Sequence, residues 1–108
     1  MLPEPPYYAV IFSSTMQAAP GSGYEEAAEA MLTLARTMPG YLGFESARDS
    51  GLGITVSYWD SLEAIAAWRD NAEHAAVRSR GRAQWYEHFD LRIAKVERQY
   101  SWTKRKHD

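Results

Sequence analysis

Two residues in the middle of the chain, Trp68 and His74, are of types that can bind and deprotonate a small molecule. The pKa of a histidine lies near neutrality, so His74 is a natural general base. The indole N–H of Trp68 can donate a hydrogen bond to a developing oxyanion, and its ring can form a flat wall. Both residues also fit plainer interpretations, as a core tryptophan and as a backbone-bonded histidine at a helix break.

Other candidates for ligand contact are spread along the chain: Ser13, Phe44, Tyr58, Arg78 and Trp85. Arg78 could hold an anionic substrate, although Arg80 and Arg82 beside it are also typical of a solvated face. Each of the others could line a pocket between a sheet and its helices, and each also fits a structural role.

Several classes of site are disfavoured by residue content. The absence of cysteine excludes disulfides, thiolate nucleophiles and cysteine-based metal sites. No carboxylate near His74 gives a metal-ligand spacing such as H-E-x-x-H. The glycine pair Gly21 and Gly23 follows Pro20, which indicates an ordinary turn. We therefore expect no metal, nucleotide or flavin.

Composition indicates one domain that contains more aromatic residues than its core can bury. Of the 108 residues, 45% are apolar, and four Trp and seven Tyr are more than one small core readily buries. Some of them should line a cavity or a subunit interface, which favours an oligomer. The net charge of −2 argues against a nucleic-acid partner. No long apolar run or signal-peptide pattern is present, so we expect a soluble, cytoplasmic protein and no membrane partner.

Hydrophobic periodicity predicts alternating strands and helices. An extended lead-in covers 1–6, one domain covers 7–102, and a basic, solvated tail covers 103–108. The predicted strands are 7–14, 41–48, 54–59 and 91–102, and the predicted helices are 24–38, one opening at 60, and 75–88.

Local signals mark several of these boundaries. Pro39-Gly40 should stop the first helix, and Asp60-x-x-Glu63 reads as a capping box that opens the second. In the last strand, Leu91 and Ile93 share one parity whereas Ala94 and Val96 share the other. This change of phase predicts either a β-bulge or a strand covered on both faces.

The element order β-α-β-β-α-β predicts an α+β, ferredoxin-like fold, a four-stranded antiparallel sheet with two helices on one face. Tyr41, Tyr100 and Trp102 suggest that the other face also carries apolar surface. Pairing two such sheets face to face would bury it, so we expect a homodimer.

Several segments together resemble the antibiotic biosynthesis monooxygenase (ABM) domain family, whose members form dimeric α+β barrels. The resemblance covers roughly Tyr7 to Trp102 and is specific for the fold and subfamily, but not for one activity. The segments that carry it are Tyr8–Phe12, Met38–Ser46, Gly53–Trp68, Glu73-His74, Gly81-Arg82, Trp85-Tyr86 and Val96–Tyr100.

The resemblance implies a cofactor-independent monooxygenase that acts on a small aromatic, quinol-like or polyketide-like compound. Such an enzyme deprotonates an electron-rich phenol or hydroquinone in an apolar pocket, and the anion then reduces O2, the co-substrate. His74 would be the base, Trp68 the donor and wall, and Arg78 an anion contact.

Other readings stay open. A non-catalytic module that binds a small hydrophobic ligand fits the residues equally well, as does a structural dimer whose aromatic residues only fill the core. In the haem-degrading branch of the family, Trp68 matches the signature Trp. The signature His falls on Arg78 and the Asn falls near Ser13, which weakens that interpretation.

Overall fold

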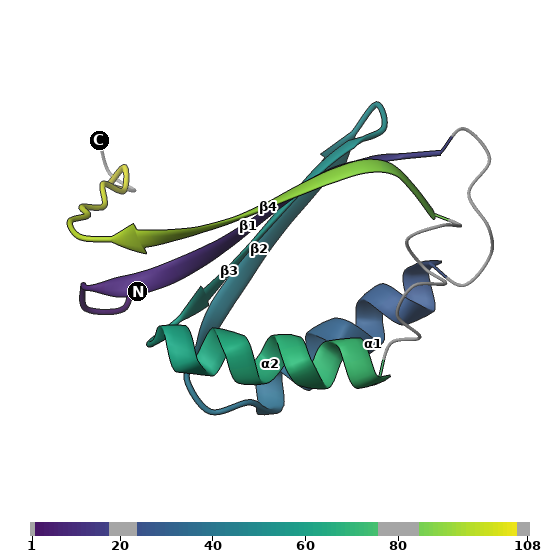
Figure 1. Ribbon diagram of the computed structural model, residues 1–108. Coiled ribbons are helices and arrows are strands. Elements are labelled where there is room, and N and C mark those ends of the chain that lie inside the picture. The colour runs from purple at the N-terminus through teal and green to yellow at the C-terminus, as the bar shows by residue number, and fades with distance from the viewer. Residues whose placement is uncertain (1, 18–23, 76–84, 106–108) are drawn as a thin grey trace.

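The computed structural model describes residues 2–17, 24–75 and 85–105, with the side chains of 27 and 72–75 excepted. Within these ranges, two helices lie side by side on one face of a four-stranded sheet (Figure 1). The α+β, ferredoxin-like order predicted from the sequence is confirmed. The elements are β1 (Tyr7–Met16), α1 (Tyr24–Thr37), β2 (Tyr41–Asp49), β3 (Leu52–Trp59), α2 (Leu62–Ala75) and β4 (Tyr86–Val96).

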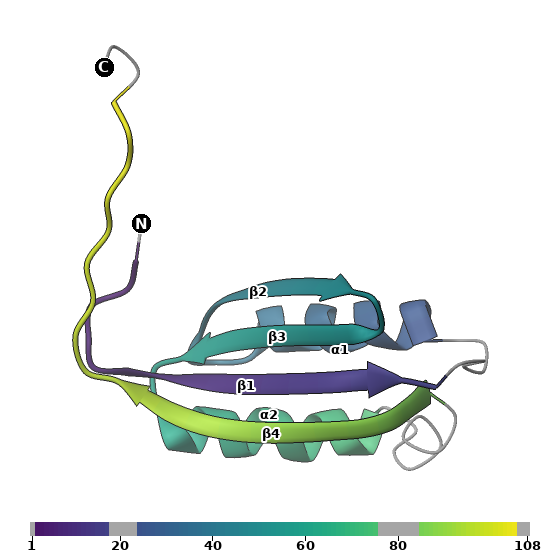
Figure 2. The ribbon, with the colours of Figure 1, turned by 90° about the horizontal axis from the view of Figure 1, so that it is seen from above.

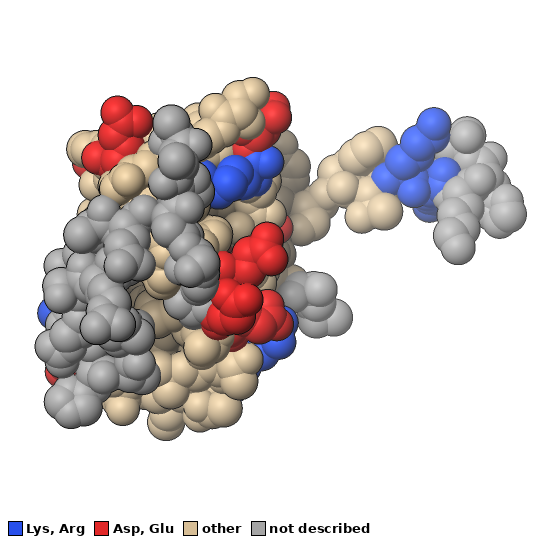
Figure 3. Space-filling model, turned by 90° about the vertical axis from the view of Figure 1, so that its right-hand side faces the viewer, with Lys and Arg blue, Asp and Glu red and all other residues tan. Residues whose placement is uncertain are grey.

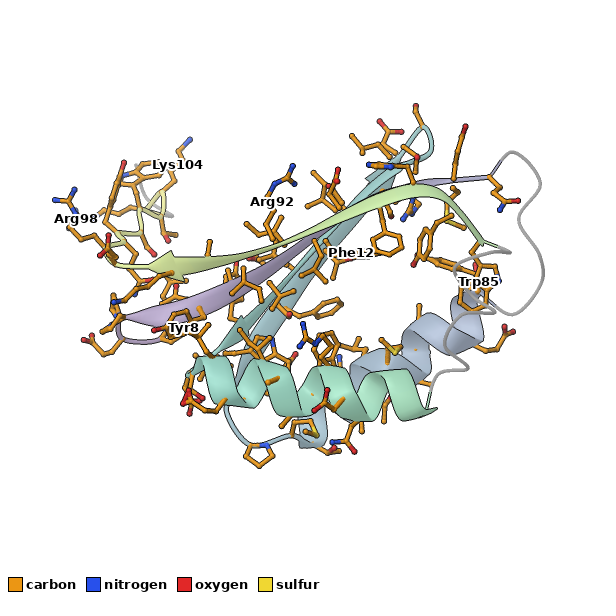
Figure 4. All side chains as sticks on the ribbon, viewed as in Figure 1. Tyr8, Phe12, Trp85, Arg92, Arg98 and Lys104 are labelled. Carbon is orange, nitrogen blue, oxygen red and sulfur yellow. The ribbon has the colours of Figure 1, made fainter. Side chains whose placement is uncertain are left out.

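The sheet has the strand order β2-β3-β1-β4, and all neighbouring strands are antiparallel. Successive side chains of a strand point to opposite faces. Figure 4 shows Tyr8 and Phe12 of β1 pointing toward the helices and Arg92 of β4 pointing away. The first of these faces is called the helix-covered face below, and the second the open face.

The core lies between the helix-covered face and the two helices. Its buried members are Val10, Ala35, Trp59 and Ile65, and Trp59 has no exposed surface. Leu and Ile side chains are few here, so the tryptophan ring supplies much of the buried apolar area. Tyr41 also packs against this cluster, although the sequence placed it on the other face.

A shift in register explains the position of Tyr41. Tyr41 pairs with Trp59, whereas Gly43 pairs with Tyr58 and Phe44 with Ser57, so one extra residue is accommodated between Tyr41 and Gly43. Such an irregularity reverses the phase of a strand. Tyr41 therefore lies on the helix-covered face, where its ring meets that of Trp59 edge-on at 5.6 Å.

Gly40 follows the end of α1 and adopts a left-handed backbone, with φ of 89°. A Cβ on Gly40 would lie 2.5 Å from Asp60 Oδ1 and 2.6 Å from the Ala64 Cβ, so the loop can approach α2 only without a side chain. The stop predicted at Pro39-Gly40 is confirmed, since α1 ends at Thr37.

The cap of α2 lies one residue later than predicted. The Ala64 N–H donates to Ser61 Oγ at 3.1 Å, which makes Ser61 the capping residue. Asp60 instead donates its backbone N–H to the Gly40 carbonyl at 2.9 Å. The contact between the loop and Asp60 therefore displaces the cap from the position that local sequence favoured.

The last strand differs most from prediction. It begins at Tyr86, within the helix expected over 75–88, and ends at Val96, short of Trp102. Residues 76–84 lie outside the described part. The aromatic side chains of Tyr86 and Phe89 pack against Phe12 of β1, so tertiary contact prevails over local periodicity here.

The change of phase in β4 does not come from a bulge. Pairing with β1 is regular from Val96 to His88 and shifts only next to Met16. Leu91 and Ile93 oppose Phe12 and Val10 on the helix-covered face, and the alternate residues face the other way. The second sequence interpretation, a strand covered on both faces, is also wrong for this chain, because Leu91 and Ile93 are each 45% exposed and the open face of β4 carries Asp90 and Arg92.

Within the described residues, the helices are too short and too polar for any of them to cross a lipid bilayer.

Candidate functional site

Trp68 of α2 combines a packing role with an unused hydrogen-bond donor. Its ring lies 5.3 Å from that of Trp59, tilted by 32°, at the margin of the core. Its Nε1 is buried and has no hydrogen-bond partner among the residues that the structure describes. Trp59 differs, because its Nε1 donates to Ser57 Oγ at 2.9 Å. Burying an unpaired donor costs about 1–3 kcal/mol, so this N–H is available to a ligand or a water molecule.

Phe44 lies on the same side of the sheet as Trp68. It pairs with Ser57, which in turn pairs with Val10 of the core, so all three strand positions belong to the helix-covered face. Phe44 is half-buried. The structure thus brings two of the sequence candidates, Phe44 and Trp68, into the layer between sheet and helices.

A cluster of aromatic rings lies further along this face, toward the end of β1. Figure 4 shows Phe12 between Tyr8 and Trp85 along the molecule, with Trp85 just before the start of β4. We call this group the aromatic cluster. Ring centroids of neighbouring members lie 5.2–5.9 Å apart, mostly edge to face, a favourable arrangement. Its members are Phe12, Tyr24, Trp85, Tyr86 and Phe89.

Trp85 was among the residues predicted from the sequence, whereas Phe12 and Tyr24 were not. Trp85, Tyr86 and Phe89 were visible as an aromatic run, whereas Phe12 and Tyr24 come from a strand and a helix more than sixty residues earlier. Only the alternation of residues within β1 could have predicted that Phe12 lies on the helix-covered face. Tyr24 carried no signal, because it is the first residue of α1.

Tyr86 is a hydrogen-bond donor at any physiological pH. Burial raises the pKa of its phenol far above the ordinary value, and Tyr24 adds to the shift through its charge and a hydrogen bond. A group held protonated in this way can donate to a ligand oxygen but cannot act as a base.

Arg48 supplies a cation at the same end of the sheet. Its guanidinium donates to Ser14 Oγ at 2.8 Å and to the Gly51 carbonyl at 2.9 Å. It also lies 6.0 Å from the centre of the Tyr24 ring, within cation–π range. It fills the space above Gly53, where a Cβ would lie 2.2 Å from Nη2. These contacts position Arg48 against the aromatic cluster.

Two other candidates lie on the opposite side of the sheet. Ser13 pairs with Ile54 and Asp90, which places it on the open face, one residue out of phase with Phe12. Tyr58 is also on the open face, where its hydroxyl donates to Glu45 Oε1 at 2.7 Å. That hydrogen bond, with burial, raises the pKa of Tyr58 to about 12. The sheet separates both residues from Trp68.

The remaining candidates are His74 and Arg78. His74 belongs to the last turn of α2, the same helix as Trp68, but its side chain lies outside the described residues, and so does the whole of Arg78. The roles assigned to them from the sequence stay predictions.

The paired strand residues on the helix-covered face include no Asp, Glu or His. Tyrosines, Arg48, serine and threonine hydroxyls and hydrocarbon make up most of this face. A base acting here must therefore come from a helix or a loop rather than from the paired positions of the sheet.

An open groove lies away from these residues. The groove has a volume of about 620 Å³ and runs along α1, where it is lined by Glu26, Glu29, Ala30, Thr33, Leu34 and Thr37. None of the sequence candidates lines it. Within the described ranges, no group of three or more His, Asp and Glu side chains could hold a metal ion.

Comparison with known proteins identifies relatives of this chain. Residues 7–80 match the family model described as antibiotic biosynthesis monooxygenase. The uncharacterized protein YqjZ of Bacillus subtilis is 56% identical over 98 residues, covering 90% of this chain and 85% of its own.

Two solved structures show the same fold at low identity. Protein SO0527 from Shewanella oneidensis has a TM-score of 0.71 at 10% identity, with 84% of this chain and 91% of that chain covered. SnoaB from Streptomyces nogalater, a cofactor-independent oxygenase, has a TM-score of 0.63 at 11% identity, with 93% and 100% covered.

Proposed function

Because this chain belongs to the antibiotic biosynthesis monooxygenase family, we propose that it is a cofactor-independent monooxygenase of a small aromatic, quinol-like or polyketide-like compound. The observation that carries the proposal is the buried Nε1 of Trp68, which has no hydrogen-bond partner among the described residues and belongs to a ring packed against the aromatic core. SnoaB, which has the same fold, is a cofactor-independent oxygenase.

The proposed substrate binds on the helix-covered face, with its ring against Phe44 and Trp68 and one oxygen accepting from Trp68 Nε1. An N–H placed in a low-dielectric layer stabilises a phenolate far more than it would in water. Further along the same face, the protonated hydroxyl of Tyr86 and the guanidinium of Arg48 could stabilise negative charge on a second substrate oxygen.

The proposed base is His74. The absence of Asp, Glu and His from the paired strand positions of this face supports a base from α2, the helix that carries both His74 and Trp68. Once deprotonated, an electron-rich ring can pass an electron to O2 without a cofactor. For a substrate CH2 group, one oxygen atom enters the product as a carbonyl and the other leaves as water, so the substrate supplies all the electrons.

We also propose that two copies pair through their open faces. Ile11 and Val56 are half-buried there, and Leu52 and Ile54 are 51% and 44% exposed. An apolar strip on a sheet face that has no covering helix supports pairing with a second sheet.

The test is oxygen consumption by the purified, metal-free protein with a panel of quinols and polyketide-like phenols. Uptake above the rate of autoxidation should appear with at least one compound. It should fall about a hundredfold or more in His74→Ala, since general-base catalysis contributes roughly that much. His88→Ala is the matched control, because His88 faces away from the site on β4 and contacts Asp90 at 3.1 Å.

A second candidate function uses the same site without turnover. The described donors and aromatic walls suffice to hold a small phenolic ligand, and the paired strand positions of this face include no Asp, Glu or His to act as a base. Tight binding of a quinol that needs Trp68 but not His74, together with no oxygen uptake, would establish the binding module instead.

A further inference from the structure

Arg48 of β2 is an exposed cation on the helix-covered face. The ion pair within the described ranges joins His88 and Asp90 on the other face, so no described carboxylate neutralises Arg48. The bonds to Ser14 Oγ and the Gly51 carbonyl use two of the five guanidinium N–H groups and leave three without a described partner. A guanidinium presents its N–H groups as a planar fork that fits a carboxylate. Arg48 can therefore bind an anion and keep the contacts that position it.

The position of this guanidinium is built into the sheet. Gly53 is the cross-strand partner of Arg48, and a Cβ on Gly53 would overlap the guanidinium. The backbone of Gly53 is not left-handed, so only the close approach of Arg48 requires a glycine there. Ser14, which accepts from Nη2, is 2% exposed. The fork is thus held in one place before any ligand arrives, which lowers the entropic cost of binding.

A strip of the helix-covered face connects Arg48 to Phe44. The two residues lie four positions apart on the same side of β2, which corresponds to about 13 Å. Ser46 lies between them and shares a hydrogen bond of 3.0 Å with Thr55 across the strands. Phe12 of β1, the partner of Thr55, places an aromatic ring beside the middle of the strip. The strip can therefore support a flat ligand along its length.

The end of the sheet that holds Arg48 carries few other cations. Figure 2 shows the turn between β2 and β3 at the same end as the start of β4, far from both termini. In Figure 3, which looks at this end of the molecule, Lys and Arg form small separate patches on the body, among several acidic groups. Attraction for an anion is therefore local here and suits a single carboxylate better than a polyanion.

We propose that the substrate is an elongated aromatic acid and that Arg48 binds its carboxylate, at the end opposite the hydroxyl that Trp68 binds. This inference rests on the proposed function, which places the reacting ring against Phe44 and Trp68. Two linked or fused rings cover the distance from Phe44 to Arg48, with the second ring beside Phe12, whereas a single ring is too short. Arg48 touches no reacting atom in this arrangement, so it determines specificity.

Two unreactive ligands isolate the charge: a hydroxybiphenyl carboxylate with its two groups at opposite ends, and the corresponding carboxamide. Calorimetric titration of the full chain should show the carboxylate binding about tenfold or more tightly than the carboxamide. Arg48→Gln should abolish this preference and leave the affinity for the carboxamide unchanged. Equal affinities for the unaltered protein, binding of neither ligand, or a preference that survives in Arg48→Gln would overturn the inference.

The matched control is Arg92→Gln, because Arg92 of β4 points away from the helices (Figure 4). This variant should keep the full preference for the carboxylate. Trp68→Phe should weaken the binding of both biphenyl ligands by the same factor, since both present the hydroxyl. For a single-ring hydroxybenzoate, only one of Trp68→Phe and Arg48→Gln should change the affinity. An effect of both substitutions on that small ligand would refute the span between the two contacts.

Oxygen consumption separates a failure of this inference from a failure of the proposed function. Uptake with neutral quinols, together with equal binding of the carboxylate and the carboxamide, would overturn the acid specificity and leave the monooxygenase intact. A preference for the carboxylate that depends on Arg48, without uptake for any compound, would support the contact with Arg48 and refute turnover.

Discussion

Trp68→Phe is the substitution whose effect follows most directly from the structure. Phenylalanine keeps an aromatic ring against Trp59 but removes the buried Nε1 donor, for which the described part of the chain offers no acceptor. The smaller ring loses hydrocarbon equivalent to one or two methylenes, at a cost of about 1–2 kcal/mol. Removing the unpaired N–H also removes its desolvation cost, which stabilises the folded protein by about 1–3 kcal/mol. The free energy of unfolding of the ligand-free protein should therefore change by about 1 kcal/mol or less.

The matched substitution is Trp59→Phe. It loses the same hydrocarbon from a fully buried position, and it also breaks the bond from Trp59 Nε1 to Ser57 Oγ. Ser57 is 8% exposed, so its hydroxyl would be left without that partner. We expect a loss of about 2–4 kcal/mol. The two variants make the same chemical change and differ in whether the N–H was satisfied.

Urea unfolding followed by far-UV circular dichroism measures both effects without relying on tryptophan fluorescence. Ligand binding then tests the function of the donor. A hydrogen bond to a phenolate contributes about 1.5–3 kcal/mol, so Trp68→Phe should weaken binding or activity roughly 10- to 100-fold. If Trp68→Phe were as destabilising as Trp59→Phe and left activity intact, the reasoning about the free donor would be refuted.

Three further predictions concern the scaffold. Gly40→Ala should cost about 2–4 kcal/mol, because the new methyl strikes Asp60 and Ala64. Gly51→Ala is the matched control, because Gly51 has a similar φ of 86° but open space around it, and it should cost only about 1 kcal/mol. If thermal unfolding showed the same loss of stability for both variants, the steric contact of residue 40 with Asp60 and Ala64 would be contradicted. Ser61→Ala should remove the α2 cap and about 0.5–2 kcal/mol by the same assay, and no change would mean that water caps the helix equally well. Tyr58 should ionise near pH 12 rather than pH 10, so its contribution to stability is complete below pH 10 and is lost as the pH rises to 12. Difference absorbance at 295 nm against Tyr58→Phe measures this, and titration near pH 10 would show that the bond to Glu45 is absent in solution.

Most of the fold could be read from local sequence because its signals are local. Alternation marked β1 and β3, helical spacing marked α1, and Pro39-Gly40 marked the end of that helix within one residue. The errors fell where distant contacts compete with local preference. The α2 cap moved from Asp60 to Ser61 because Asp60 contacts the Gly40 loop.

The candidate site was predictable in its residue types more than in its geometry. Trp68 was chosen as a donor from its type, but its free Nε1 depends on which acceptors the fold leaves within reach. Ser13 and Tyr58 were chosen with it, yet strand register puts both on the open face. A shift of one residue in a strand reverses the face, and sequence alone seldom fixes register that finely.

The sequence by itself determined the element order, the fold class and the supply of donor and aromatic residues, because periodicity and turn chemistry act over a few neighbouring positions. Only the tertiary structure decided which residues meet. It gathered Phe12, Tyr24 and Tyr86 from three elements and placed Arg48 against Ser14. It also left Tyr100 and Trp102 without a strand to pair with. Those outcomes depend on the register and packing of segments far apart in the chain, which no local pattern encodes.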